Sequence, residues 1–143
     1  MVQTRLLWGA CLLAAMGALL GGCRIIPPID DRGQFHDYGS LREIMRHVDH
    51  YHARLQDQRG GFRTSIASFD DLMLYCDYVQ ALCRQARYRY GTNRPELTAR
   101  AVNVVKTVRE IMIRARGLET DKDLVGDLMD ELARRIDLMK KAA

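Results

Sequence analysis

The stretch Phe69–Tyr90, FDDLMLYCDYVQALCRQARYRY, carries the pattern that decides the fold. Its apolar side chains recur at alternating steps of three and four residues, which places them along one face of a helix with a heptad period. Ser68, followed by Asp70 and Asp71, predicts the start of this helix, and Gly91 predicts its end. The seam consists of Phe69, Leu72, Cys76, Val79, Cys83, Ala86 and Tyr90.

A second helical segment precedes this seam in the chain. The pattern Ser40-Leu41-Arg42-Glu43 predicts a capping box, in which Ser40 accepts from the third helical amide and Glu43 accepts from the Ser40 amide. Gly60-Gly61 predicts the end of the helix. Its apolar face comprises Leu41, Ile44, Met45, Val48, His52 and Leu55.

Two more helical segments follow the seam. Pro95 fits the first turn of one, with Thr92 or Asn93 as its cap, and Gly117 closes it. The segment Thr120–Asp123 caps the other. Their apolar faces are Leu97, Ala101, Val104, Val105, Val108, Ile111, Met112 and Ala115 in the first, and Leu124, Val125, Leu128, Met129, Leu132, Ile136 and Met139 in the second.

These four segments predict the fold class. None of the chain alternates with the period of two that a strand would show. The second, third and fourth helices are joined by only a few residues, so neighbours must run antiparallel. We therefore expect an all-α, up-down four-helix bundle over residues 40–143.

Length and composition fit one folded domain. The chain has 143 residues, of which 48% are hydrophobic and 28% charged, a balance typical of globular proteins rather than disordered ones. The net charge of +4 is mild for this length and does not by itself indicate a nucleic-acid partner.

The N-terminus differs in kind from the rest of the chain. A basic start at Met1–Arg5 and the uncharged run Leu6–Leu20 lead to Leu20-Gly21-Gly22-Cys23. This order is typical of a secretory signal peptide, and the run is shorter than the roughly 20 residues of a membrane span. With its cysteine, the segment resembles a bacterial lipoprotein signal. An uncleaved transmembrane helix and an ordinary signal with a chance cysteine are the alternatives.

The resemblance implies a lipid anchor. A diacylglyceryl group would be attached to the Cys23 sulfur, the signal peptide over residues 1–22 removed, and the new N-terminus acylated, for example with palmitate. Arg24 is not the aspartate that retains enterobacterial lipoproteins in the inner membrane, so the outer membrane, facing the periplasm, is favoured. Residues 23–39, with Pro27-Pro28 and Asp30-Asp31, are expected to form a lipidated tether with a reach of about 50 Å.

Histidines in the first helix are candidate metal ligands. His47 and His50 are three residues apart, and His52 shares the apolar face with Met45. Histidine and methionine that enter a bundle core together could bind haem or copper. The alternative is a solvated polar flank for His47 and His50, and a hydrogen-bonded His52 at the edge of the core.

Two cysteines lie on the seam. Cys76 and Cys83 are seven residues apart, so their Cα atoms are separated by about 10.5 Å on a helix. A disulfide requires less than about 7 Å, so the two cannot bridge each other. We expect both to pack in the core, with a metal, redox or intermolecular role as the alternative.

The seam helix also predicts a partner surface. Leu74, Tyr78 and Leu82 step by four residues beside Tyr75. Apolar helical positions with neighbouring tyrosines are typical of protein interfaces, although bundle helices also widen their apolar arc to touch two neighbours. The basic side chains of residues 84–94 and Lys140-Lys141 could meet anionic headgroups.

No motif predicts catalysis. The chain contains no nucleophile elbow, no glycine-rich phosphate loop, no zinc-protease helix and no CxxCH haem motif. We therefore expect no enzyme but a membrane-anchored envelope lipoprotein, whose helical module binds or positions a partner protein of the envelope. The alternative is a periplasmic helical bundle that binds or senses a metal or haem. Nucleic acid is not expected as a partner of an exported protein.

Overall fold

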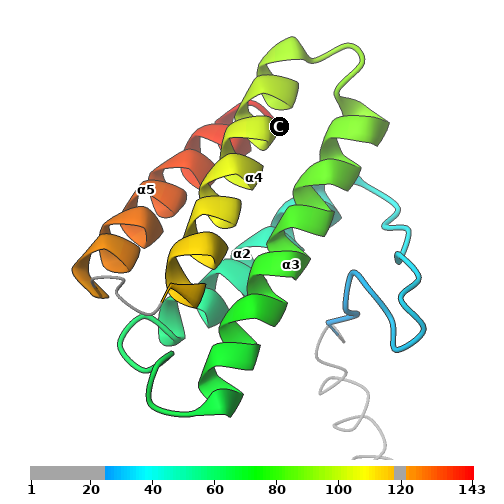
Figure 1. The fold of residues 1–143 in the computed structure, drawn as a ribbon. Coiled ribbons are helices and arrows are strands. Elements are labelled where there is room, and N and C mark those ends of the chain that lie inside the picture. The colour runs from blue at the N-terminus through cyan, green and yellow to red at the C-terminus, as the bar shows by residue number, and fades with distance from the viewer. Residues whose placement is uncertain (1–24, 118–121) are drawn as a thin grey trace, which may run out of the picture.

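The fold is an all-α four-helix bundle, as predicted. The computed structural model describes residues 25–117 and 122–143. Its helices are α2 (Leu41–Asp57), α3 (Ile66–Tyr90), α4 (Pro95–Arg116) and α5 (Lys122–Lys141), packed against one another in chain order (Figure 1). None of the helices in the described residues is long and apolar enough to span a membrane. The signal segment with Cys23 lies outside the described residues, as does the predicted cap residue Thr120.

The start of α2 follows the predicted cap with one difference. The hydroxyl of Ser40 accepts a hydrogen bond from the Glu43 amide at 3.2 Å, as predicted. The carboxylate of Glu43, however, accepts from the Gly39 amide at 3.1 Å rather than from the Ser40 amide. The backbone before the helix is extended at Ser40, and the preceding amide is the one within reach.

Helix α3 begins three residues before the predicted start. The hydroxyl of Ser65 accepts from the Ser68 amide at 3.1 Å, so Ser65 caps the helix and Ser68 lies within its first turn. Two serines three residues apart offer the same capping signal, and the extended backbone at Ser65 decides between them.

The corner between α3 and α4 is tight. Arg94, which makes no side-chain capping bond, precedes Pro95 at the helix start, so the predicted caps Thr92 and Asn93 are wrong. The Gly91 amide donates to the Arg87 carbonyl at 2.9 Å, and the Thr98 hydroxyl donates back to the Gly91 carbonyl at 3.2 Å. A Cβ on Gly91 would lie within 2.4 Å of both helices, so only glycine fits this corner.

The predicted apolar faces form one core. On α3, Leu72, Cys76, Val79, Cys83 and Ala86 are buried, while Phe69 and Tyr90 pack against the core at the two ends of the seam. Leu124 at the start of α5 is 39% exposed, whereas the rest of its predicted face is buried or partly buried. The remaining buried apolar side chains on the other helices include Ile44, Val48, Leu55, Leu97, Val104, Val108, Ile111, Val125, Met129, Leu132, Ile136 and Met139.

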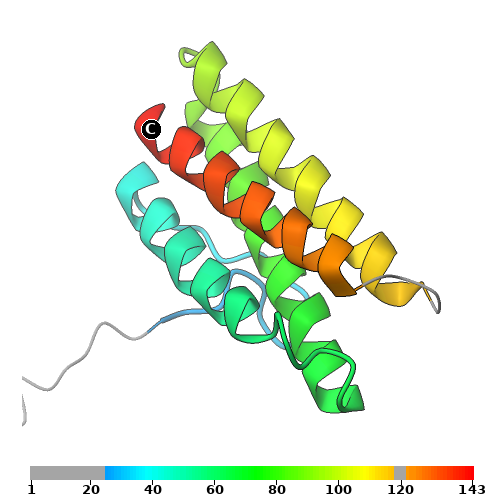
Figure 2. The same cartoon turned by 90° about the vertical axis from the view of Figure 1, so that its left-hand side faces the viewer.

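Polar contacts join α2 and the residues just after it to α5. Figure 2, seen from the side of α5, shows α2 and α4 flanking this helix. Arg59 forms a two-pronged ion pair with Asp130 at 2.5 and 2.8 Å, and Lys140 pairs with Asp49 at 2.9 Å. Asp49 pairs with Lys140, and Arg59, later in the chain, pairs with Asp130, earlier on α5, so the two segments run antiparallel.

Residues 25–39 pack against the bundle as a strap rather than extend as a free tether. Asp30 accepts from two backbone amides in a turn that Gly33 completes with φ 75°, and the Ile29–Phe35 bridge closes this turn. Tyr38 is buried, and its hydroxyl donates to the Ile26 carbonyl at 2.7 Å. The 50 Å reach expected from an extended chain therefore does not apply to the strap, which lies beside α3 in Figure 1.

The Gly91 corner gives a stability prediction. Gly91→Ala forces Cβ into the Arg87 carbonyl and the Thr98 hydroxyl, and we expect it to lower the free energy of unfolding by at least about 1 kcal/mol. Gly60→Ala is the matched control, because a Cβ there meets nothing within 4 Å and the change should stay within about 0.5 kcal/mol. Urea unfolding followed by circular dichroism measures both. Equal effects at the two positions would contradict the close approach at Gly91.

Candidate functional site

The four residues predicted as a partner surface differ in their exposure. Leu82 is completely buried and does not reach the surface, so this part of the prediction is wrong. The rings of Tyr75 and Tyr78 are half-buried against Tyr51 of α2, at 6.3 and 4.8 Å between centroids. Leu74 alone is exposed, at 42%. Helix α3 is flanked by α2 and α4, and its wide apolar arc serves both contacts.

The three candidate histidine ligands point into different surroundings. His47 is 1% exposed and lies against the Tyr38 ring, with centroids 4.4 Å apart. His50 packs edge-on against Tyr51, and the His52 ring shares a hydrogen bond with the Gln56 amide at 3.1 Å. The expectation of a solvated His47 is wrong, because the strap covers it.

No metal centre is assembled in the part of the chain that the structure describes. Within residues 25–117 and 122–143, no three His, Cys, Asp or Glu side chains come close enough together to hold an ion. Met45, the fourth candidate ligand, is buried in the core. His47 and His50 are neighbours on α2 at a spacing of three residues, but the rings of His47, His50 and His52 contact different groups and do not converge on one point.

His47 is an unusual core residue. Its Nδ1 is buried and has no hydrogen-bond partner among the described residues. Burial lowers the pKa of His47 below its ordinary value, and the nearby Arg46, His50 and His36 act in the same direction, against an opposing effect of Glu43. Near neutral pH, the folded protein therefore favours the neutral form of His47.

Both seam cysteines are core side chains, as expected. Cys76 and Cys83 are free and fully buried, and the Cys83 sulfur lies 3.8 Å from the Met139 sulfur. Burial raises the pKa of each thiol to about 12. Because the thiolate is the reactive form, burial makes both cysteines less reactive in the folded state.

A groove between α3 and α4 is the most distinctive surface feature. It has a volume of about 710 Å³, in the range of roughly 300–1,000 Å³ typical of small-molecule sites. The strap contributes Phe35 at its edge. The groove is lined by Phe35, Ala81, Cys83, Arg84, Gln85, Arg87, Tyr88, Arg89, Ala101, Val102, Val105, Lys106 and Arg109.

The rim of the groove is positively charged. Five of these lining residues are Arg or Lys, and none of them is Asp or Glu. Arg89 pairs with Asp37 of the strap, whereas the other four form no ion pair within the described residues. The guanidinium of Arg87 lies over the Tyr88 ring at 4.8 Å. A cleft lined by charges of one sign concentrates their potential and attracts ligands of the opposite sign.

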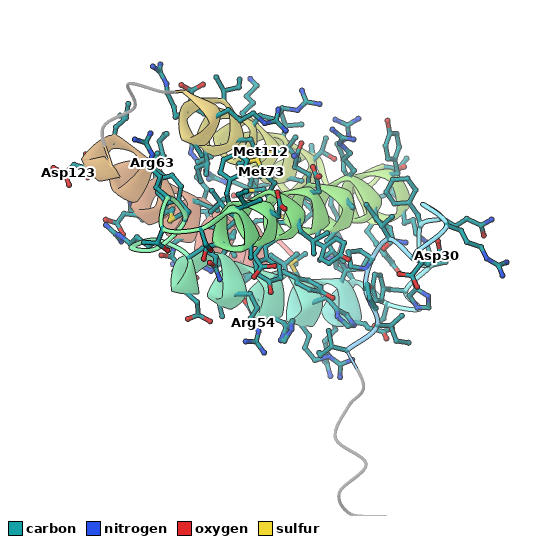
Figure 3. All side chains as sticks on the ribbon, turned by 60° about the horizontal axis from the view of Figure 1, so that its bottom comes forward. Asp30, Arg54, Arg63, Met73, Met112 and Asp123 are labelled. Atoms are coloured by element: carbon teal, nitrogen blue, oxygen red, sulfur yellow. The ribbon has the colours of Figure 1, made fainter. Side chains whose placement is uncertain are left out.

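A buried amide organises two of these cations. Gln80 of α3 is 7% exposed, and its Oε1 accepts from Arg84 Nη2 at 3.4 Å and from Arg109 Nε at 3.3 Å. Its Nε2 donates to the sulfur of Met112 at 3.1 Å, which fixes the orientation of the amide. Figure 3 marks Met112 on α4 and Met73 on α3, the two helices that flank the groove. Two guanidiniums from different helices thus meet on one neutral acceptor.

The floor of the groove is apolar and made of small side chains. Its apolar lining comes from Ala81 and Cys83 of α3 and from Ala101, Val102 and Val105 of α4, of which Cys83 has no exposed surface. The short side chains leave room above them, while the aromatic rings of Phe35 and Tyr88, 66% and 72% exposed, stand at the edge. The arrangement suits a ligand that is negatively charged at one end and apolar along its length.

Sequence reasoning found only part of this site. The basic segment over residues 84–94 contains Arg84, Arg87 and Arg89, whereas Gln80, Lys106 and Arg109 lie outside it. Gln80 and Arg84 are four residues apart, which is a local signal for a contact. Nothing local connects Arg109 to Gln80, because α4 brings it there only through helix packing.

Comparisons with known proteins do not add to this description. A scan against protein-family models, a search of curated proteins and a search of solved structures each found no match to the chain. The chemistry of the groove therefore has to be judged from its own residues.

The buried thiols give a reactivity prediction. In the native protein near neutral pH, N-ethylmaleimide should modify neither Cys76 nor Cys83, because both are buried and protonated. Both should react fully in denaturing urea. Mass spectrometry of the digested protein assigns the sites. Modification of either cysteine in the folded protein would mean that the seam opens in solution.

The neutral, buried His47 gives a pH prediction. Unfolded His47 takes up a proton near its ordinary pKa of 6.5, whereas the folded residue resists it, so stability is lost as the pH falls below about 6.5. His47→Phe keeps a ring against Tyr38 and should reduce the loss between about pH 7.5 and 5.5. The pKa of His52 is also lowered, so part of the loss should remain. Urea unfolding across this range measures the slope; an unchanged slope in the variant would contradict the assignment.

Proposed function

We propose that the protein is a lipid-anchored lipoprotein of the bacterial envelope whose helical bundle is a non-enzymatic binding module. The observation that carries the proposal is the α3–α4 groove, with its five basic side chains, no carboxylate and a small-residue apolar floor. A groove that combines basic side chains with an apolar floor is suited to hold a ligand, so binding is the function that the geometry supports best.

The anchor and the bundle would lie close together. The proposal places the lipid on Cys23, within the lipobox Leu20-Gly21-Gly22-Cys23. Ile25, two positions later, already packs against the core. Two residues span at most about 7 Å, so an anchored bundle would sit at the membrane surface and not at the end of a long tether.

The side chains that line the groove determine the chemical class of ligand that it can bind. A ligand for this groove has to present negative charge to the basic rim and an apolar edge to the floor. The envelope partner protein proposed from the sequence would meet this requirement with an acidic, apolar-edged segment. The periplasmic location that follows from the anchor disfavours nucleic acid as the natural occupant.

Metal or haem binding is the weaker candidate. It would require His47, His50, His52 and Met45 to converge, and the structure places these side chains in separate surroundings. No single observation favours it over the groove.

The anchor is tested by metabolic labelling. Cells that express the full-length chain are grown with an alkyne-bearing fatty acid, and the protein is examined for label and for membrane association. We expect the label and the membrane association to be lost in Cys23→Ser and retained in Cys11→Ser, the matched control within the signal. Equal labelling of Cys23→Ser and the original chain would contradict the lipoprotein proposal.

A further inference from the structure

We infer that the α3–α4 groove binds an anionic amphiphile with a single alkyl chain, such as a fatty acid or a lysophospholipid. The inference rests on the proposed role of the groove as a binding site and names its ligand class. The shared chemistry is one negatively charged head, carboxylate or phosphate, joined to one flexible hydrocarbon chain.

The head would be held by the guanidiniums that Gln80 organises. Arg84 and Arg109 come from different helices and converge on Gln80 Oε1, and neither forms an ion pair with a carboxylate among the described residues. Because Gln80 is a neutral acceptor, both guanidiniums keep their full charge and further N–H donors for an incoming anion. Lys106 adds a third cation to the groove lining. Gln80 is thus a positioning residue and the two arginines are the binding groups.

The chain would lie along the floor. Ala81, Ala101, Val102 and Val105 are small and offer no hydrogen-bonding side chain to a polar ligand. The groove volume of about 710 Å³ is that of a small-molecule site. The exposed rings of Phe35 and Tyr88 provide further apolar surface at the edge, where the chain would be shielded from water.

Other occupants satisfy only part of this surface. A free inorganic anion would pair with the arginines and leave the apolar floor uncovered. A protein partner typically contacts about 20–30 residues on each side, more than the thirteen that line the groove. A single alkyl chain with a charged head would pair with the basic side chains of the rim and also cover the apolar floor.

The experiment measures displacement of a fluorescent fatty acid. The full mature chain is carried in phosphatidylcholine nanodiscs and titrated with 11-(dansylamino)undecanoic acid, with empty nanodiscs as the background. Dodecanoate and a single-chain lysophosphatidylglycerol should displace the probe, whereas dodecyl maltoside and lysophosphatidylcholine should not. Along the series octanoate, decanoate and dodecanoate, affinity should rise about fourfold for each added methylene.

Matched variants locate the site. Arg84→Gln with Arg109→Gln should weaken binding about tenfold or more, since two charge-assisted hydrogen bonds are lost. Arg100→Gln with Arg114→Gln removes the same charge from α4 positions paired with Glu96 and Glu110, and should leave affinity unchanged. Val102→Trp should fill the groove and abolish binding, whereas Ile113→Trp, at an exposed position of the same helix, should not.

Gln80→Met tests the positioning role. It keeps the size of the side chain but removes the acceptor, so affinity for dodecanoate should fall while the dependence on chain length is retained. Circular dichroism confirms that each variant is folded before its affinity is compared.

Three outcomes would overturn the inference. Equal binding of acetate or inorganic phosphate and dodecanoate would mean an anion site without a role for the floor. Binding of an acidic amphipathic peptide, lost in Val102→Trp, without any binding of the amphiphiles would overturn the ligand class and leave the proposed function standing. Binding that none of the groove variants changes, or no binding of peptide or amphiphile, would overturn both.

Discussion

The structure depends on the burial of one face of α3. Its seam of Leu72, Cys76, Val79, Cys83 and Ala86 is completely covered, and the helices on either side pack against it along its length. Burial of apolar surface is the dominant favourable contribution to folding, at about 25 cal/mol per Å². The neighbouring helices pack around this seam, and ion pairs and a side-chain amide join α5 to α2 and the residues just after it.

The groove follows from the same packing. On the α3–α4 side the facing residues include Ala81, Ala101 and Val105, so the two helices leave space above short side chains instead of filling it. The flanking positions carry arginine and lysine, which project from the rims because charged heads remain in water. Gln80 is the exception, since its amide is buried and its two arginine partners and a methionine sulfur satisfy it. The apolar floor and the ordered cations therefore both result from the packing of α3 against α4.

The strap links the N-terminus to this surface. Tyr38 covers His47 of α2, while Gln85 and Arg89 of α3 bind the strap backbone, the former through the His36 carbonyl at 2.9 Å. Phe35, from the same strap, lines the groove. If Cys23 carries the proposed lipid, the short connection to Ile25 would keep the bundle at the membrane surface, where amphiphiles are available.

The sequence by itself determined the all-α bundle, because helical periodicity, caps and short connections are local properties that survive without knowledge of neighbours. It also indicated the core role of both cysteines and part of the basic cluster. Only the tertiary structure decided that Leu82 is buried, that the strap covers His47 and that Arg84 and Arg109 share Gln80. The Tyr38–His47 and Gln80–Arg109 contacts join residues 9 and 29 positions apart in the chain, and helical periodicity alone cannot specify which faces of two helices meet.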